Sequence, residues 1–361
     1  MTSAPYTYPY ARAMRTSDFD YPLPRDLIAQ VPIEPRDHSR LLVVGHSTSE
    51  LEHSRFYDIG QFLKPGDLLV LNDSRVIPAR LKGRRLGTGG AIEVLLLHRV
   101  DKGLWKALVK PGRRLRPGAR FEVDGVEGEV LEDSGVGTRL IHISDEGIIQ
   151  RSGEMPLPPY INIPLADRER YQTVYARIDG SAAAPTAGLH FTPELLENLS
   201  RDGIRFARVT LHVGLDTFRP VQSEEPEKHK LHLEYFELDK NAAREINLAR
   251  AESRRIISVG TTSVRVLEQA AILSHLECEG TLKPVSGWAD LFILPGHRFR
   301  LVDGLITNFH LPRSTLLMLV CAFAGRDTSQ DSGRSLVLRA YQEAIGQGYR
   351  LFSFGDCMLL F

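Results

Sequence analysis

Residues Ile257–Leu267 have the sequence ISVGTTSVRVL, in which an apolar run meets a Gly–Thr–Thr–Ser turn and then a helix-like repeat. The run Arg255–Val259 predicts a buried strand, and Val264–Leu273 predicts the helix that follows it. The same alternation continues on both sides, from the helix that Thr192 would cap to a last strand at Leu351–Phe354. Strands that alternate with helices in this way predict a layered α/β domain.

A different pattern interrupts this domain. Ala91–Val100 and Leu104–Val109 are short β-type runs, and turns rich in glycine and proline, such as GTGG and RPG, separate the runs of this region. Several short strands without a helical period predict a small β-barrel. We therefore expect a flexible leader at residues 1–16, a layered α/β main domain for cofactor binding and catalysis at 17–64 plus 156–361, and an inserted β-barrel domain at 65–155.

The composition is that of an ordinary globular protein, because 42% of the 361 residues are apolar and 25% are charged. The longest apolar run, Leu316–Ala324, is far shorter than the ~20 residues that span a membrane. The three cysteines lie far apart and form no C-x-x-C pair, which argues against a zinc, iron–sulfur or disulfide framework. We expect a cytoplasmic protein without a membrane partner.

Charge is distributed unevenly along the chain. Overall, 45 Lys and Arg balance 45 Asp and Glu, but Arg75–Arg120 contains thirteen basic residues against two acidic ones, a local net charge of +11. Together with Trp105 and Phe121, this charge predicts contact of the barrel with an RNA or DNA backbone, although a solvated basic face would show the same composition. The centre of the stretch holds the candidate contacts Arg113, Arg114 and Arg116.

The turn at residues 260–263 is a candidate anion site. Free N–H groups at a helix start attract a carboxylate or phosphate, and the hydroxyl groups of Thr261, Thr262 and Ser263 add donors. Arg265 could hold the same anion with two hydrogen bonds. An ordinary capped strand-to-helix turn is the alternative. The chain contains neither a Walker loop nor a G-x-G-x-x-G motif, so the usual nucleotide fingerprints are absent.

Two histidines are candidates for proton transfer. His190 ends a run of very small residues, GSAAAPTAGLHF, that would let a ligand approach the backbone. His212 follows a predicted strand and has Asp216 nearby in sequence, although a structural core histidine fits the pattern equally well. We expect His190, His212 and Asp216 to lie in the catalytic site.

Polar residues also follow two other predicted strands. Asn72, Asp73 and Arg75 could orient a polar ligand at the junction of the two domains, and Asn308 and His310 precede a predicted helix in a similar way. An Asx turn with surface charge would explain the first group as well. His229, His232 and Glu234 have a spacing near that of metal ligands, but a strand would point the two histidines to opposite sides, so we expect no metal site.

Taken together, these segments resemble the S-adenosylmethionine:tRNA ribosyltransferase-isomerase family of queuosine biosynthesis. The resemblance covers almost the whole chain from Asp18, and long unusual strings in a fixed order are more specific than any short motif. The strings are DFDYPLPRDLIAQ, PGDLLVLNDSRVIPARL, GEMPLPPYI, RYQTVYA, GSAAAPTAGLHFT, VTLHVGLDTFRPV, VGTTSVRVLE, GWADLFILPG and LITNFHLPRSTLLMLV.

The resemblance implies that the ribosyl group of S-adenosylmethionine is transferred to 7-aminomethyl-7-deazaguanine at the tRNA wobble position and isomerised. The product would be epoxyqueuosine-tRNA, with release of adenine and methionine. S-adenosylmethionine would be a cosubstrate, and no cofactor would be bound permanently. The sulfonium group acidifies the neighbouring 5′ carbon and makes the sulfur a good leaving group, so a base and accurate positioning could suffice without a metal. We expect a monomer.

Residue roles remain hypotheses within this resemblance. We expect His190 and His212 to transfer protons, residues 261–263 and Arg265 to surround S-adenosylmethionine, and the polar groups at the junction to face the tRNA base. Two rival classes remain: a metal-dependent RNA hydrolase with His190, His212 and Asp216 as ligands, and a non-catalytic RNA-binding protein that uses only the basic barrel. Activity that survives chelation would exclude the first rival, and adenine release in the presence of modified tRNA would exclude the second.

Overall fold

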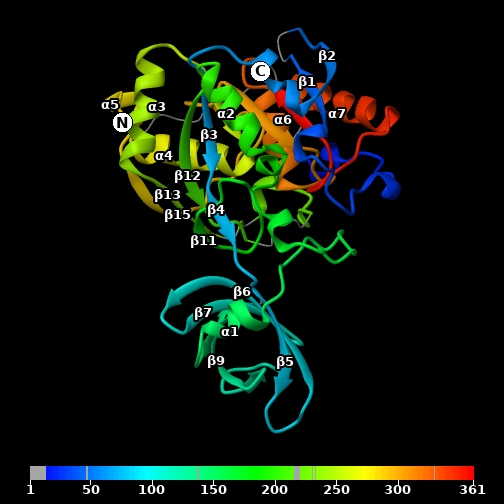
Figure 1. Ribbon diagram of the computed structural model, residues 1–361, viewed down its shortest axis with the longest axis vertical. Helices are drawn as coiled ribbons and strands as arrows, with labels where there is room; N and C mark the ends of the chain where they lie inside the picture. Colours follow the sequence, from blue (N-terminus) through cyan, green and yellow to red (C-terminus); the bar gives the residue numbers. More distant parts are fainter. Residues whose placement is uncertain are drawn as a thin grey trace.

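The computed structural model describes residues 14–45, 48–135, 138–214, 220–229, 231, 233–328 and 330–361. It has a large layered part and a separate closed barrel, which is at the bottom of Figure 1. The predicted α/β fold with an inserted barrel is thereby confirmed. In the residues that are described, no helix is both long and apolar enough to cross a membrane. Most of the expected leader lies outside the described residues.

A sheet of nine strands forms the centre of the layered part, in the order β15-β13-β12-β3-β14-β16-β17-β1-β2. Strands β12, β3, β14 and β16 are neighbours and run parallel. Strands β13, β15 and β2 pair in antiparallel fashion at the two edges. The bounds are β1 Arg40–Val44, β2 Leu51–Arg55, β3 Leu68–Asn72, β12 Arg205–Leu211, β13 Glu234–Leu238, β14 Ile256–Val259, β15 Val285–Ala289, β16 Gly304–Asn308 and β17 Cys357–Leu360.

Both faces of this sheet are covered, which explains the apolar sequence of its central strand β3. Leu68 and Val70 belong to the core under the longer helices, whereas Leu69 and Leu71 belong to the core on the other face. A strand that is buried on both faces reads as a continuous apolar run. The first core is covered by α3 Lys240–Ala251, α4 Thr261–Leu273, α5 Leu276–Glu279, α6 Thr315–Ala324 and α7 Gln330–Gly346, and the second by the 3-10 helices η4 Phe56–Phe62 and η6 Thr186–His190 together with α2 Pro193–Arg201.

Side-chain caps begin several of these helices. The Thr192 hydroxyl accepts a hydrogen bond from the Leu195 N–H at 3.1 Å, as its place before Pro193 predicts. Asp239 caps α3 and Ser314 caps α6 in the same way. The capping residues in the local sequence therefore determine where these helices start.

The barrel is closed, with the strand order β10-β7-β6-β5-β8-β9. Its strands are β5 Arg80–Arg85, β6 Ala91–Asp101, β7 Leu104–Lys110, β8 Arg120–Val123, β9 Val126–Gly135 and β10 Thr138–Ile143, and the short helix α1 Gly147–Ser152 packs its isoleucines into the same core. Because β3 belongs to the large sheet, the start of the barrel moves from the expected residue 65 to Arg80. Trp105 and Phe121 are buried in the barrel core, so neither is the surface aromatic that we expected.

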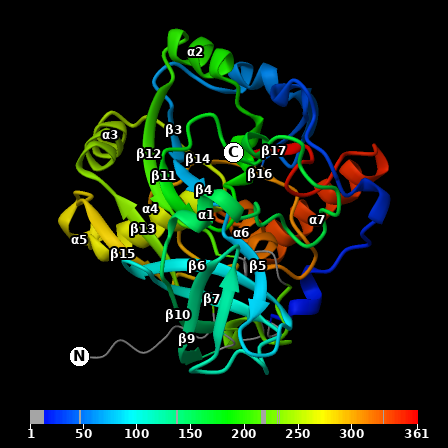
Figure 2. The ribbon, with the colours of Figure 1, turned by 60° about the horizontal axis from the view of Figure 1, so that its bottom comes forward.

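The barrel is attached at one end of the large sheet. After β3 the chain forms β4 Ser74–Val76, which pairs with β11 Ile178–Ser181, and it then enters the barrel. The entering and leaving chains lie side by side, because Arg80 and Glu154 form a bridge. Strand β6 also lies against β11. The barrel therefore projects from the edge of the sheet at which the parallel strands end (Figures 1 and 2).

Candidate functional site

The candidate residues gather at the carboxyl ends of four neighbouring parallel strands. Asn72 and Asp73 lie at the end of β3, His212 follows β12, Gly260 and the start of α4 follow β14, and Asn308 ends β16. In open α/β sheets, ligands bind outside the carboxyl ends of the parallel strands. This edge is the one to which the barrel is attached, so both parts of the chain border the same site.

His190 lies at the end of η6 with only 4% of its surface exposed. Its Nδ1 is 2.7 Å from the Ser39 hydroxyl oxygen, and its Nε2 is 3.1 Å from the amide nitrogen of Asn308. The Thr186 hydroxyl donates to the Asn308 amide oxygen at 2.8 Å, which turns the amide nitrogen toward the imidazole. Nε2 therefore accepts, and Nδ1 carries the proton.

Burial and the positive charges of Arg350 and Arg36 lower the pKa of His190 to about 3. The imidazole is thus neutral at physiological pH, and both of its nitrogens are already hydrogen-bonded within the protein. His190 therefore connects η6 to β16 in this structure. A proton-transfer role would require a ring nitrogen that is free to reach the substrate.

His212 has a more open environment at the end of β12. Its Nδ1 is 2.8 Å from the Ser74 hydroxyl oxygen, and its ring stacks on Tyr235 with a centroid distance of 5.9 Å. Burial, followed by the nearby His98, lowers the pKa of His212 to about 4, and Asp73 and Asp179 oppose this shift. The Nε2 atom has no hydrogen-bond partner among the residues that are described. Asp216, the third predicted member of this group, lies outside the described residues.

Gly180 is the reason that His212 can occupy this place. A Cβ atom at position 180 would lie 2.8 Å from the imidazole, and the φ of Gly180 is +144°. Both the backbone conformation and the space therefore require glycine here. The run of small residues before His190 thus makes room for His212, a function that its sequence alone did not reveal.

Two of the three polar residues after β3 are structural. Asn72 is fully buried, and its amide bonds to the backbone of Leu211 and Ser74, so it joins β3 to β12. Asp73 is 1% exposed and pairs with Arg177 at 2.8 Å. Neither presents a free polar group to a substrate, which corrects the direct contact that we expected.

Arg75 is the member of this group that reaches the surface. It is half-buried and forms ion pairs with Glu169 and Asp179. Its guanidinium therefore lies at the domain junction, as the sequence predicts, but it is already engaged by carboxylates of the chain.

The start of α4 agrees only in part with the anion site predicted there. Gly260 has a φ of +89°, and Thr261, Thr262 and Ser263 are all buried. The Ser263 hydroxyl donates to the Val259 carbonyl at 2.9 Å, whereas the Thr262 hydroxyl has no partner among the described residues. Ser263 is therefore held by the fold, whereas the buried hydroxyl of Thr262 is left for a ligand.

Arg265 is held away from this helix start. Its guanidinium forms a buried ion pair with Glu234 and also donates to the carbonyls of Leu291 and Ala289. Glu234 in turn accepts from the Gly214 N–H at 2.7 Å. The expected role of Arg265 as an anion clamp is therefore replaced by one that fixes α4 to β13 and β15.

The sequence analysis missed four further buried hydroxyls without a partner in the described part of the chain, those of Ser134, Tyr171, Thr173 and Tyr175. Two of them, Thr173 and Tyr175, lie against Gly188 of η6. The neighbouring Ala187 lies against Gly260, which precedes Thr262. Buried polar groups are normally hydrogen-bonded, so unpaired ones around a loop indicate a place for a polar ligand. Tyr175 also lies near Asp73, whose charge adds to burial in raising the tyrosine pKa.

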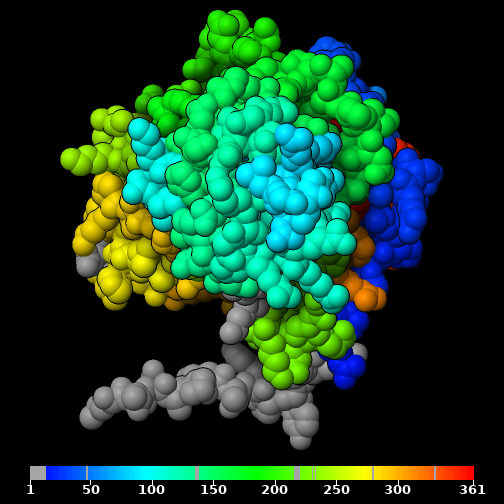
Figure 3. Space-filling model, turned by 90° about the horizontal axis from the view of Figure 1, so that it is seen from below, coloured from blue at the N-terminus to red at the C-terminus, as the bar shows by residue number. Residues whose placement is uncertain are grey.

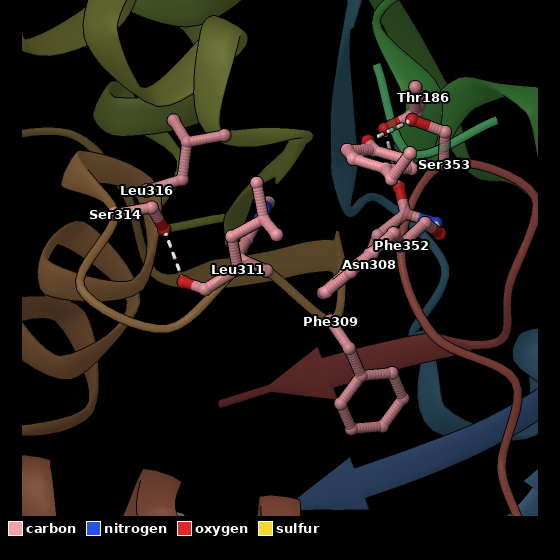
Figure 4. A pocket seen from close by; sticks show the side chains of 10 residues that line it. Thr186, Asn308, Phe309, Leu311, Ser314, Leu316, Phe352 and Ser353 are labelled. Carbon is pink, nitrogen blue, oxygen red and sulfur yellow. Dashed lines mark hydrogen bonds between the residues drawn. The ribbon is translucent and has the colours of Figure 1, made fainter. Parts of the chain in front are cut away.

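Asn308 and His310 line a narrow cavity of about 30 Å³ beside this loop. Thr186, Asn308 and Ser353 lie together on one side of it, and Ser314 and Leu316 lie on the other (Figure 4). His310 Nε2 is 2.7 Å from the Thr307 hydroxyl oxygen, and burial lowers the pKa of His310 to about 3. A cavity of this size holds a water molecule and no nucleoside.

Arg113, Arg114 and Arg116 are exposed on the loop between β7 and β8, and none has an ion pair with a described residue. Folding nevertheless offsets part of the +11 charge of this stretch, because acidic residues from later in the chain pair with basic residues inside it. These pairs are Arg75–Glu169, Lys82–Glu154, Arg84–Glu122, Arg99–Glu146 and Arg120–Glu127.

In the ranges that the structure describes, no group of three or more His, Cys, Asp or Glu side chains could hold a metal ion. The two nitrogens of His190 are also occupied by Ser39 and Asn308. The described residues therefore do not form the metal site that a metal-dependent RNA hydrolase would need. Asp216, which this rival function also uses, lies outside the described residues.

A mixed sheet with polar residues at the carboxyl ends of its parallel strands, and a closed barrel inserted at that edge, defines an α/β protein with an inserted β-barrel domain. The family model described as queuosine biosynthesis protein matches residues 16–360. The chain belongs to this family, and the resemblance seen in its sequence is confirmed.

Relatives of known name agree with this family. A protein from Symbiobacterium thermophilum, named S-adenosylmethionine:tRNA ribosyltransferase-isomerase, is 54% identical over 353 residues, which cover 96% of this chain and 100% of the relative. A protein of the same name from Dehalococcoides mccartyi (strain CBDB1) is 52% identical over the same shares. The crystal structure of S-adenosylmethionine tRNA ribosyltransferase from Thermotoga maritima is 40% identical, covers 96% of this chain and 100% of that chain, and superimposes with a TM-score of 0.55.

Proposed function

We propose that this protein transfers the ribosyl group of S-adenosylmethionine to 7-aminomethyl-7-deazaguanine at the wobble position of tRNA and isomerises it. The products are epoxyqueuosine-tRNA, adenine and methionine. One observation carries this proposal. In a chain of the queuosine biosynthesis family, the inserted barrel lies at the carboxyl ends of the parallel strands. One edge can receive a small cosubstrate from the sheet side and an RNA from the barrel side.

On the sheet side, the start of α4 and the loop around η6 are our proposed site for S-adenosylmethionine. The unpaired hydroxyls of Thr262, Thr173 and Tyr175 supply hydrogen-bonding groups there. The helix start favours the carboxylate of the methionine part, because its N–H groups carry a partial positive charge. The site requires no permanently bound cofactor.

His212 is our proposed proton acceptor. It is neutral at physiological pH, its Nε2 is free of hydrogen bonds to the described residues, and Ser74 and Gly180 hold the ring in place. His190 is proposed to hold η6 in position through Ser39 and Asn308, because its own nitrogens are occupied. Asp216 remains a candidate partner of this site.

On the RNA side, we propose that the exposed arginines of the barrel contact the tRNA backbone, and that the protein acts as a monomer in the cytoplasm, where tRNA is modified. Arg113, Arg114 and Arg116 carry positive charge that no described carboxylate neutralises. Such charges bind phosphates without reading the base sequence.

The test is the release of adenine from S-adenosylmethionine. We expect release that depends on tRNA carrying 7-aminomethyl-7-deazaguanine and that persists after treatment with a chelator. Tight tRNA binding without adenine release would favour the non-catalytic rival, and loss of release upon chelation would favour the metal-dependent one.

A further inference from the structure

Three ring side chains form a row across the edge of the large sheet. His212 follows β12, Tyr235 lies on β13, and Trp288 lies on β15 directly opposite Tyr235 in the antiparallel register. The ring centroids are 5.9 Å apart between His212 and Tyr235, and 5.8 Å apart between Tyr235 and Trp288. The row begins at the proposed proton acceptor and leads outward from it.

A fourth ring comes from the barrel. His98 of β6 packs edge-on against Trp288, with centroids 4.5 Å apart and an angle of 84° between the ring planes. His98 also contributes to the low pKa of His212, so the two imidazoles lie near each other across the domain junction. In Figure 2, β6 of the barrel passes beside β15, and in Figure 3 the surfaces of these two segments meet.

The contacts of Trp288 with neighbouring rings leave much of this residue open to solvent. Trp288 retains 43% of its surface exposed, although it contacts both Tyr235 and His98. The neighbouring residues on β13, Phe236 and Leu238, point into the opposite face of the sheet and are buried under the helices. The aromatic row thus lies on the face of the sheet that turns toward the barrel.

Positive charge borders this row. Lys106 of β7 is the cross-strand neighbour of His98, and burial together with the Lys106 charge lowers the pKa of His98. Lys102, Lys106 and Lys110 are all exposed and have no ion pair with a described residue. Proteins that bind single-stranded nucleic acid combine aromatic side chains, which stack on bases, with basic groups that follow the backbone.

We propose that Trp288, supported by Tyr235 and His98, is a stacking platform for an unpaired base of the RNA substrate. This base belongs to the loop that carries the modified nucleotide and lies next to that nucleotide, while Lys106 contacts the adjoining phosphate. The proposal rests on the proposed function in one respect, which is that the substrate is an RNA loop. It adds the residue that holds this loop against the site.

The chain has two tryptophans, and only Trp288 is exposed, because Trp105 is buried in the barrel. Intrinsic fluorescence therefore reports on stacking. We expect an RNA hairpin with an unpaired loop to quench the emission of the wild-type protein, and we expect this quenching to disappear in Trp288→Phe, in which Trp105 remains. A fully paired RNA duplex of equal charge is the matched probe, and it should quench weakly.

The kinetic test uses adenine release with modified tRNA. We expect Trp288→Ala to raise the KM for tRNA about tenfold or more, with little change in kcat or in the KM for S-adenosylmethionine. Trp288→Phe should restore the KM to within about threefold, because phenylalanine keeps a stacking face. Leu273→Ala, at another exposed apolar position with 50% of the leucine exposed, is the matched control and should leave all constants unchanged.

The outcomes separate this inference from the proposed function. Adenine release by the wild-type protein together with an unchanged tRNA KM in Trp288→Ala would overturn the stacking platform and leave the activity standing. Equal quenching by hairpin and duplex would also overturn it, since the tryptophan would then respond to charge alone. Absence of adenine release with the wild-type protein would overturn the proposed function, whereas the fluorescence experiment would still decide whether Trp288 stacks on RNA.

Discussion

The amide nitrogen of Asn308 donates to Nε2 of His190 at 3.1 Å, so the end of β16 and the end of η6 are held together by a neutral imidazole. The opposite nitrogen of the ring bonds to Ser39, which precedes β1. One histidine thereby connects three segments that are far apart in sequence. Its neutrality is a condition of this arrangement, because a protonated Nε2 could not accept from Asn308.

The stability of the protein should therefore depend on pH. His190 and His310 have a pKa of about 3 and His212 one of about 4, against roughly 6.5 in the unfolded chain. At a pH between the folded and unfolded pKa values, the unfolded state binds more protons than the folded state. The free energy of unfolding should therefore fall as the pH drops from 6.5 toward 4. Each histidine contributes a slope of up to about 1.4 kcal/mol per pH unit.

Urea unfolding followed by circular dichroism at several pH values measures this slope. His310→Gln should flatten it, since glutamine cannot take up a proton. The control is His142→Gln, which replaces an exposed histidine of the barrel and should leave the slope unchanged. A free energy of unfolding that stays constant from pH 6.5 to pH 4 would contradict the prediction.

Substitution of His212 should affect the reaction more than binding. His212→Ala removes the proposed proton acceptor, so single-turnover adenine release should slow by about 100-fold or more, with the affinity for S-adenosylmethionine retained. Gly180→Ala should slow release as well, because its new Cβ would lie 2.8 Å from the imidazole. Wild-type rates in His212→Ala would exclude this residue from proton transfer.

Removal of the Thr262 hydroxyl should weaken ligand binding without lowering the stability of the fold. Since it has no partner among the described residues, Thr262→Val should leave the melting temperature unchanged or raise it, while weakening S-adenosylmethionine binding by about tenfold. Isothermal titration and thermal unfolding measure the two effects. Thr210→Val is the matched control: its hydroxyl bonds to Asp73 at 2.7 Å, so it should lose stability instead. The reverse pattern in the two variants would refute the assignment.

Charge reversal on the barrel loop should weaken tRNA binding. With Arg113, Arg114 and Arg116 changed to Glu, the affinity should fall and the dependence of log Kd on log salt should become shallower by up to about 0.9 per lost phosphate contact. The same change of charge on α3 serves as the control and should have a smaller effect; it uses Lys240, Arg244 and Arg250. Equal losses from both triple variants would show a general effect of net charge.

Sequence patterns predicted the parts of this structure that are set locally. The strand, turn and helix at Ile257–Leu267 form as expected, because apolar spacing and the Gly260 turn act within a few residues. The barrel was predicted from its short strands, but β3 was assigned to it, because a buried strand of the large sheet looks the same as a barrel strand until its partners are known.

The partners of polar side chains could not be read from the sequence. Arg265 and Glu234 lie 31 residues apart, and their ion pair depends on how α4 packs on β13. Asn72 looked like a ligand-binding residue because it follows a strand, whereas its amide closes the gap between β3 and β12. Trp288 was not predicted as a site residue, because its exposure is the feature that distinguishes it. That exposure depends on where the barrel lies, which the sequence does not reveal.

The insertion of the barrel has a consequence for the order in which the chain folds during synthesis. The strands of the barrel are contiguous from Arg80 to Ile143, whereas β3 must wait for its neighbours at 205–211 and 256–259. Local contacts form faster than distant ones, so the barrel should mature on the ribosome while β3 is still unpaired. Proteolysis of ribosome-bound chains that end before β12 would test this, with a protected barrel and a cleaved β3 as the expected result. The accessory domain would then be the first part of the enzyme to exist.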